Sequence, residues 1–191
     1  MLSGLPASLQ GLPVLGLFGA DFMVNYDVDI DVPHHHFALY SLHECGKRIE
    51  PFDPPYFEVP FQLDNTAIKL DLKLNDTTLK AQLDSGASIT TITEEDARRA
   101  GVTKTLLASD PADTRLVGVD QHPVSAHRHQ FGSLEIGNEK MSNFHFAVAD
   151  ISTDNTLLGA DFFRLNRVWI SYSRGILFIQ PAGHLMPDRV R

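Results

Sequence analysis

The residues of this chain whose types and spacing could do chemistry lie in one short segment, Asp84-Ser85-Gly86-Ala87. The segment places a carboxylate next to a hydroxyl, followed by a glycine that allows a sharp backbone turn. An aspartate held in this way can act as a general acid or base if a second carboxylate faces it, because the two can share one proton around a water molecule. The question is therefore which residue supplies the second carboxylate.

The elements that must position this segment are strands. Residues 79–83 alternate apolar and polar side chains before it, and residues 88–92 are rich in β-branched side chains after it. The pattern predicts a strand, a tight loop that carries the carboxylate, and a second strand. Residues 57–63 and 67–74 also alternate, and Asn75-Asp76 predicts a hairpin turn after them.

The sequence after the loop alternates short strand patterns with turns about every ten residues. Thr93 fits the N-cap of a short helix, which Gly101 ends. Residues 114–131 predict a long hairpin, and residues 133–136 and 143–149 predict two further strands. Many short strands with few helices predict an all-β barrel or sandwich.

Composition excludes several classes of protein. A chain of 191 residues with 43% hydrophobic residues can bury one sizeable core. The net charge of −8 argues against nucleic acid or an anionic membrane as a partner. The single cysteine, Cys45, excludes an intrachain disulfide.

The sequence predicts neither a membrane span nor a signal peptide. No apolar stretch reaches the roughly 18 residues that a spanning helix needs. Residues 11–24 are apolar, but no Lys or Arg precedes Lys47, so the positive segment of a signal peptide is missing. We expect a buried strand and a short helix there, and the compartment, cytoplasmic or periplasmic, is left open.

The chain contains a partial internal repeat. Residues 17–22 match residues 157–162, with Gly19 and Gly159 140 positions apart. The same offset aligns two further pairs, Val28 with Val168 and Ile30 with Ile170. Both copies predict an apolar strand, a glycine, a short helix and a two-stranded hairpin.

The repeat predicts the domain organisation. Residues 1–44 form the C-terminal part of a first domain, the proline-rich residues 45–56 a linker, residues 57–183 a complete domain and residues 184–191 a tail. At this offset the counterpart of Asp84 falls before Met1, so the first part has no such loop. Because it cannot close a core alone, it docks on the complete copy, pairs with another chain, or belongs to a longer tandem protein.

The order of these motifs resembles that of a known family. An Asp-Ser-Gly-Ala loop, a short helix, a hairpin that contains Gly118, and then Leu157-Leu158-Gly159 before a helix resemble the retropepsin-like aspartic proteases, most closely the bacterial gag-polyprotein type. The resemblance covers residues 57–181, with the end of a second such domain at residues 12–42. It implies an all-β, retropepsin-like acid protease β-barrel with one or two short helices.

The resemblance also implies roles for individual residues. Asp84 would be the catalytic aspartate, and Ser85 would brace the facing loop, with Gly86-Ala87 supporting the approach of the two loops. Val117-Gly118-Val119 would lie in the flap that closes over a peptide. Leu157-Leu158-Gly159 would back the catalytic loop, and neither a metal nor another cofactor is implied.

The implied activity is that of an aspartic endopeptidase with a peptide or protein substrate. Its two carboxylates would titrate about three pH units apart, and aspartic proteases are themselves the standard example of this effect. A homodimer would supply a second Asp84, and a pseudo-dimer would supply the equivalent loop. The alternatives are an inert dimerisation or peptide-binding module, or a truncated tandem protease, because this chain holds a single Asp-Ser/Thr-Gly.

Other candidate residues have structural interpretations. His34-His35-His36 and the pair His127 and His129 have no Cys or acidic partners at ligand spacing, so we expect solvated histidines rather than metal ligands. Asp21 and Asp161 each open a short helix, which favours N-capping. Trp169 is expected in the core or at a dimer surface.

Overall fold

The computed structural model describes residues 8–9, 11–16, 18–41, 51–112, 114–117, 123–151 and 155–182. Six strands close a barrel, which confirms the predicted all-β fold. In ring order they are β7 (Ala67–Leu74), β8 (Thr77–Leu83), β13 (Thr156–Leu158), β9 (Thr91–Thr93), β12 (Glu139–Ala149) and β11 (Pro123–Ile136). β11 closes the ring, because its last residues, Leu134 to Ile136, also pair with β7.

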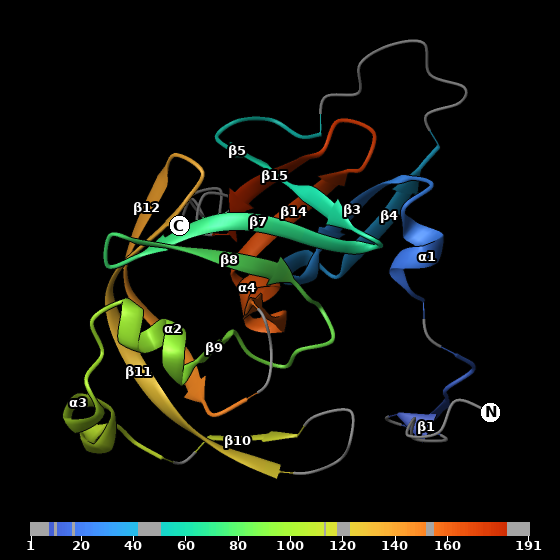
Figure 1. Cartoon of the computed structure of the whole chain (residues 1–191). Helices are drawn as coiled ribbons and strands as arrows, with labels where there is room; N and C mark the ends of the chain where they lie inside the picture. The colour runs from blue at the N-terminus through green and yellow to red at the C-terminus, as the bar shows by residue number, and fades with distance from the viewer. Residues whose placement is uncertain are drawn as a thin grey trace, which may run out of the picture.

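Two short strands extend the barrel sheet, and a second sheet packs beside it. β6 (Gln62–Asp64) pairs with β7, and β10 (Thr114–Val117) pairs with β11. The second sheet joins segments from both ends of the chain (Figure 1). Its order is β4 (His36–Tyr40), β3 (Asp27–Asp31), β14 (Asn166–Ser171), β15 (Ile176–Pro181) and β5 (Phe57–Pro60).

The helices are short and lie at the ends of strands. They are α1 (Ala20–Met23), the 3-10 turn η1 (Val32–His34), α2 (Glu94–Arg99), α3 (Lys104–Ser109) and α4 (Ala160–Leu165). A two-stranded pair, β1 (Ser8–Leu9) and β2 (Leu12–Pro13), stands apart from both sheets. None of the helices within the described residues has the length and apolar character that a membrane crossing requires.

Local sequence signals account for several element ends. The Thr93 hydroxyl accepts a hydrogen bond from the N–H of Asp96 at 3.0 Å, so the predicted N-cap of α2 is confirmed. Gly101 follows that helix with φ +93°, a conformation that other residues rarely adopt. The turn between β7 and β8 has Asn75 and Asp76 at φ +46° and +66°, which matches the twist of a tight hairpin.

The core is continuous between the barrel and the second sheet. Alternate residues of β7 and β8 are buried, as the period of two predicts. The largest fully buried side chains come from both sheets and from α4, and they include Trp169, Phe131, Phe146, Phe162 and Phe178. The expectation that Trp169 belongs to the core is confirmed, since it is 1% exposed and stacks on Tyr40 at 4.6 Å.

Two expectations about local structure are wrong, and one helix was not expected. The strand expected at residues 57–63 is divided, because the chain leaves β5 in the second sheet and enters β6 in the barrel sheet at Phe61. The strand expected at residues 88–92 is confined to β9, since the N–H of Thr90 donates to the side chain of Asp161, although its carbonyl accepts the N–H of Ala147 in β12. Helix α3, capped by the Thr103 hydroxyl, was not predicted.

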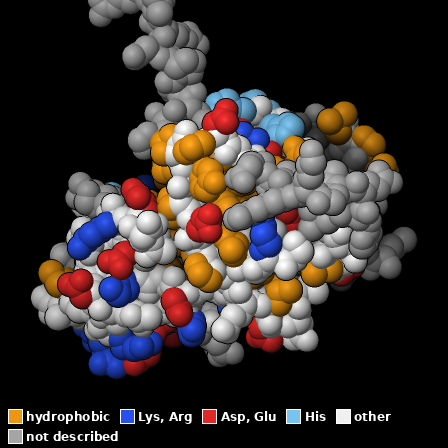
Figure 2. Space-filling view, turned by 90° about the horizontal axis from the view of Figure 1, so that it is seen from above, with side chains coloured by type: hydrophobic (Ala, Val, Ile, Leu, Met, Phe, Trp, Pro, Cys, Tyr) orange, Lys and Arg blue, Asp and Glu red, His pale blue; other side chains and the backbone are white. Residues whose placement is uncertain are grey.

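The apolar N-terminal segment is not buried. Leu12 is 72% exposed and Leu15 is 95% exposed, so the buried strand expected at residues 11–24 is wrong, although the short helix is present as α1. The view from above shows hydrophobic side chains at the surface together with interspersed acidic and basic ones (Figure 2).

Candidate active site

Asp84 lies at the point where β8 leaves the barrel. Its N–H donates a hydrogen bond to the carbonyl oxygen of Leu158 at 2.9 Å, and its own carbonyl accepts the N–H of Ala87 at 3.2 Å. β13 runs parallel to β8 with Leu158 paired to Leu83. The backbone of Asp84 is therefore fixed by the buried strand beside it and by the turn that follows.

The carboxylate of Asp84 is held by its own loop. Its Oδ1 accepts the N–H of Gly86 at 2.9 Å, while Ser85 and Gly86 are exposed and Asp84 is half-buried. The backbone of Gly86 is not in the left-handed region. The sharp turn that we expected therefore does not explain why a glycine stands at this position. A Cβ there would lie 3.1 Å from Asp84 Oδ1, which is a close approach.

The start of α4 packs tightly against the same loop. The N–H of Ala160 donates to the carbonyl of Ala87 at 2.7 Å. A Cβ on Gly159 would lie 2.5 Å from the carbonyl carbon of Ile89 and 2.8 Å from the carbonyl oxygen of Ala87. Glycine is therefore required at position 159, because no backbone atom there can move without moving the loop.

A side-chain contact that the sequence did not reveal ties the end of the loop to α4. Asp161 Oδ1 accepts both the N–H and the hydroxyl of Thr90, each at 2.8 Å. The Thr90 hydroxyl in turn accepts the N–H of Gly159 at 3.2 Å. Asp161 is not the N-cap that we expected, since the N-cap residue of α4 is Gly159 and Asp161 lies in the first turn.

The structure brings together some of the predicted site residues and not others. Residues 84–87 and 157–159 meet where β8 and β13 end, as described above. Val117 is the last residue of β10, and Gly118 and Val119 lie outside the described residues. The described structure thus contains one loop with one carboxylate and the strand that supports it.

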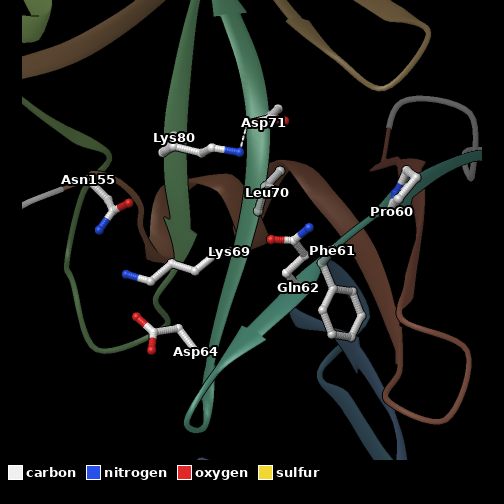
Figure 3. Close-up of a pocket in the computed structure, with 9 residues that line it drawn as sticks. All are labelled: Pro60, Phe61, Gln62, Asp64, Lys69, Leu70, Asp71, Lys80 and Asn155. Carbon is white, nitrogen blue, oxygen red and sulfur yellow. Dashed lines mark ion pairs between the residues drawn. The ribbon is translucent and has the colours of Figure 1, made fainter.

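Two pockets among the described residues lie away from Asp84. One of about 620 Å³ lies along β6, β7 and β8, and Figure 3 shows Lys80 and Asp71 pointing toward each other in it. The Lys80 ammonium and the Asp71 carboxylate form an ion pair of 2.6 Å. Lys69 in the same pocket donates to the side-chain oxygen of Gln82 at 2.7 Å. A smaller one of about 240 Å³ is lined by Thr90 and Asp161, among others. Asp84 lines neither of these two pockets; it is half-buried, beside the exposed Ser85 and Gly86.

One of the histidines departs from the sequence prediction, whereas His34, His35 and His36 are exposed as expected. His129 is 14% exposed and its Nδ1 lies 2.6 Å from a carboxylate oxygen of Asp110, so the expectation of a solvated histidine is wrong there. His34 is half-exposed and lies 2.8 Å from Asp31. Among the described residues, no group of three or more His, Cys, Asp or Glu side chains is arranged to hold a metal.

A row of acidic side chains on β3 is buried against β14. Asp27, Asp29 and Asp31 are each at most 4% exposed. Arg167 donates two hydrogen bonds to Asp29, at 3.0 and 2.6 Å, and this contact raises the pKa of the guanidinium. The indole N–H of Trp169 donates to Asp27 at 3.2 Å. The signal in the sequence was the Asp-Val-Asp-Ile-Asp alternation of β3.

Comparison with known proteins agrees with this architecture. A family model described as aspartyl protease matches residues 70–162. Among solved structures, the chain is similar to a retropepsin-like aspartic protease from Rickettsia conorii, at 20% identity and a TM-score of 0.51, over 65% of this chain and 89% of that one. The fold is that of the retropepsin-like aspartic proteases.

Two further solved structures are matched over most of their own length. The retroviral protease-like domain of Ddi1 from Leishmania major matches at 18% identity and a TM-score of 0.47, over 65% of this chain and 98% of that one. The EIAV protease, solved with an inhibitor, matches at 23% identity and a TM-score of 0.45, over 56% and 92%. A search of curated proteins finds no match.

Proposed function

We propose that this chain supplies one half of an aspartic endopeptidase site, with Asp84 as its catalytic carboxylate. The observation that supports this most is the construction of the Asp84 loop. Its backbone is bonded to the buried strand β13, and its carboxylate is oriented by the N–H of Gly86, while the loop remains exposed. An aspartate that accepts the N–H two residues later also occurs in ordinary turns, so the support comes from the whole arrangement: an exposed loop whose backbone is anchored on β13 and packed against the start of α4.

The chemistry requires a second carboxylate across from Asp84. The ionised member of the pair takes a proton from a water molecule as the water oxygen attacks the peptide carbonyl carbon. The protonated member stabilises the developing oxyanion, and a proton then passes to the leaving nitrogen as the C–N bond breaks. An extended substrate would pair with strands beside the loop, and Val117-Gly118-Val119 would cover it.

The second carboxylate is better supplied by a pseudo-dimer than by a symmetric homodimer. In the second sheet β14 has no free edge, because it pairs with β15 on one side and with β3 of the same chain on the other. A homodimer joined through β14 would have to displace β3 and β4. We therefore propose that residues 1–44 are the end of a first retropepsin-like domain and that residues 57–183 are the second, complete one.

A non-catalytic module is the second candidate. It is favoured by the single Asp-Ser/Thr-Gly of the 191 residues, because one carboxylate cannot make the pair. In that case the barrel would bind extended peptides or another protein without cleaving them.

Cleavage of a mixed peptide library between pH 3.5 and 7.5 separates the two candidates. The native chain is compared with Asp84→Asn and with Asp64→Asn, an exposed aspartate in the pocket of Figure 3. Cleavage by the native chain and by Asp64→Asn, with none by Asp84→Asn, supports the peptidase. Equal peptide binding by all three with no cleavage supports the module.

A further inference from the structure

β3 and β14 meet about a local two-fold axis. Asp29 pairs directly with Trp169, the residue 140 positions later. On either side of that pair the partners exchange, since Val28 pairs with Ile170 and Ile30 with Val168. Such an exchange is what an isologous contact between two related units produces. The α1–β3–β4 unit and the α4–β14–β15 unit are therefore placed as two halves of one symmetric arrangement.

The two halves differ at their outer edges. On one side β5 pairs with the outer edge of β15, from Ile176 to Ile179. On the other side the corresponding residues, 36–39, lie in β4, whose outer edge pairs with no strand of the described residues. The half that contains β4 thus lacks the strand that its counterpart has.

The same half exposes an aromatic face where its counterpart is buried. Phe18, Phe22 and Phe37, which we call the aromatic face, are 52%, 44% and 50% exposed. Phe18 contacts the other two rings, with centroids 4.7 and 6.0 Å apart. The residues 140 positions later are all in the core and at most 1% exposed, namely Leu158, Phe162 and Leu177.

The two halves also differ at Asp21, which is exposed where its counterpart is bonded. Its counterpart, Asp161, holds the loop of Asp84 by accepting two hydrogen bonds from Thr90. Asp21 has the same place in the first turn of α1, but it is exposed, and no hydroxyl of the described residues bonds it. In Figure 1, α1 and the segment before it stand away from the barrel, on the side to which the loop after β8 projects.

We propose that the aromatic face binds a second retropepsin-like barrel, which completes the site. That barrel would pack apolar side chains on Phe18, Phe22 and Phe37 and would add a strand to β4. It would carry its own Asp-Ser/Thr-Gly loop and, six positions after the aspartate, a hydroxyl residue that bonds Asp21, as Thr90 bonds Asp161. The inference rests on the proposed function for the role of that loop, whereas the interface rests on the exposed side chains alone.

A second copy of this chain does not fit the aromatic face as this partner. Its barrel is already closed over its own α4 by Leu158 and Phe162, so the surface that would receive the aromatic face is occupied in that copy. The fitting partner is a barrel that lacks its own α4 and hairpin.

An extended chain tests this interface. Residues 57–157 of the same sequence are placed directly before Phe18, in place of residues 1–17, so that the junction follows the register of the repeat. Amide hydrogen exchange is measured in α1 and β4 of the extended and native chains. We expect exchange in both elements to slow by at least about tenfold in the extended chain, because a docked barrel would suppress local opening. Unchanged exchange would overturn the proposal.

Two matched variants of the extended chain locate the contact. Phe22→Asp places a charge in the aromatic face, whereas Leu106→Asp places one on α3, where Leu106 is 51% exposed. We expect Phe22→Asp to return the exchange of α1 and β4 to that of the native chain and Leu106→Asp to leave the protection in place. Protection that survives both variants would show that the added barrel does not use the aromatic face.

Measurements on the native chain keep the proposal testable if the extended chain does not fold. Binding of the apolar dye ANS should fall at least twofold in Phe22→Asp and stay unchanged in Leu106→Asp, and the native chain should sediment as a monomer. A dimer that Phe22→Asp dissociates would mean that a second copy occupies the face, which overturns the proposal.

Peptide cleavage by the extended chain separates this inference from the proposed function. The extended chain holds two copies of the Asp84 loop. Protection of α1 and β4 without cleavage would support the interface and count against the peptidase. Cleavage that Asp84→Asn in either copy abolishes, without protection of α1 and β4, would support the peptidase and overturn the interface.

Discussion

Thr90 and Asp161, 71 positions apart in the sequence, are joined by two hydrogen bonds of 2.8 Å that reach the same carboxylate oxygen. Thr90 is 1% exposed, so its N–H and hydroxyl lose their partner at a buried position if the carboxylate is removed. This contact connects the end of the Asp84 loop to the first turn of α4. It makes the position of the loop depend on a helix that the sequence places far downstream.

Asp161→Ala should lower the free energy of unfolding by about 1–3 kcal/mol, because it leaves a buried donor unsatisfied. Thr90→Ser keeps both donors and should cost much less. Urea unfolding of the two variants checks this. Equal losses would mean that the methyl group of Thr90, and not the hydrogen bonds, carries the stability.

Gly159→Ala should be the most harmful small change near the site. The added Cβ would meet backbone atoms of Ile89 at 2.5 Å and of Ala87 at 2.8 Å, and neither can give way as a flexible side chain could. We expect a loss of about 1–3 kcal/mol or more in the free energy of unfolding.

The matched control for this change is Gly16→Ala, since a Cβ on Gly16 would meet nothing within 4 Å. Thermal unfolding of both variants measures the difference. A melting temperature of Gly159→Ala as high as that of Gly16→Ala would show that the loop shifts freely, which would contradict the rigid support described for Asp84.

Much of the barrel could be predicted because its signals are local. The alternation of residues 67–74, the Asn75-Asp76 turn and the Thr93 cap each depend on neighbours within a few positions. These features were confirmed. The repeat with its offset of 140 likewise predicted the hairpins β3–β4 and β14–β15. Two copies of one pattern, aligned with each other, limit where the strands of each hairpin can begin and end.

The features that the sequence did not reveal depend on contacts between distant residues. The chain changes sheets at Phe61 because β5 finds its partner in β15, more than a hundred positions later. His129 leaves water because Asp110, before β10, lies 2.6 Å away. Residues 88–90 have the composition of a strand, but the carboxylate of Asp161 takes the N–H that a sheet would use. Local propensity cannot anticipate such competition.

The ion pair of Arg167 and Asp29 should hold the α1–β3–β4 unit on the complete copy. Asp29 is 0% exposed, so removing its partner leaves a buried charge. Arg167→Leu should therefore lower the free energy of unfolding by about 3 kcal/mol.

The pKa of Arg167 is raised by its hydrogen bonds to Asp29. Because this pKa is raised in the folded chain, the ion pair stabilises the fold fully at any pH below the pKa of a free guanidinium. That contribution is lost only when the pH rises through the raised pKa. The arginine thus stays charged throughout the acid and neutral range.

Urea unfolding at pH 5 and pH 8 measures this contribution, with Arg98→Ala as the control. Arg98 pairs with Glu95 on the surface, and both side chains are more than 60% exposed, so we expect no measurable change there. If the two variants lower the free energy of unfolding equally, the buried ion pair does not hold the α1–β3–β4 unit on the complete copy.

Trp169 reports whether the α1–β3–β4 unit unfolds together with the barrel. It is the only tryptophan of the chain, and it stacks on Tyr40 of β4 and donates to Asp27 of β3. Because this unit shares one sheet with β14 and β15, we expect the urea transitions followed by Trp fluorescence and by far-UV circular dichroism to coincide. Tyr40→Ala removes the stacked ring and should move the fluorescence transition to lower urea, ahead of the circular dichroism. If the native chain already shows two separate transitions, the unit is docked too weakly to serve as a fixed base for a second barrel.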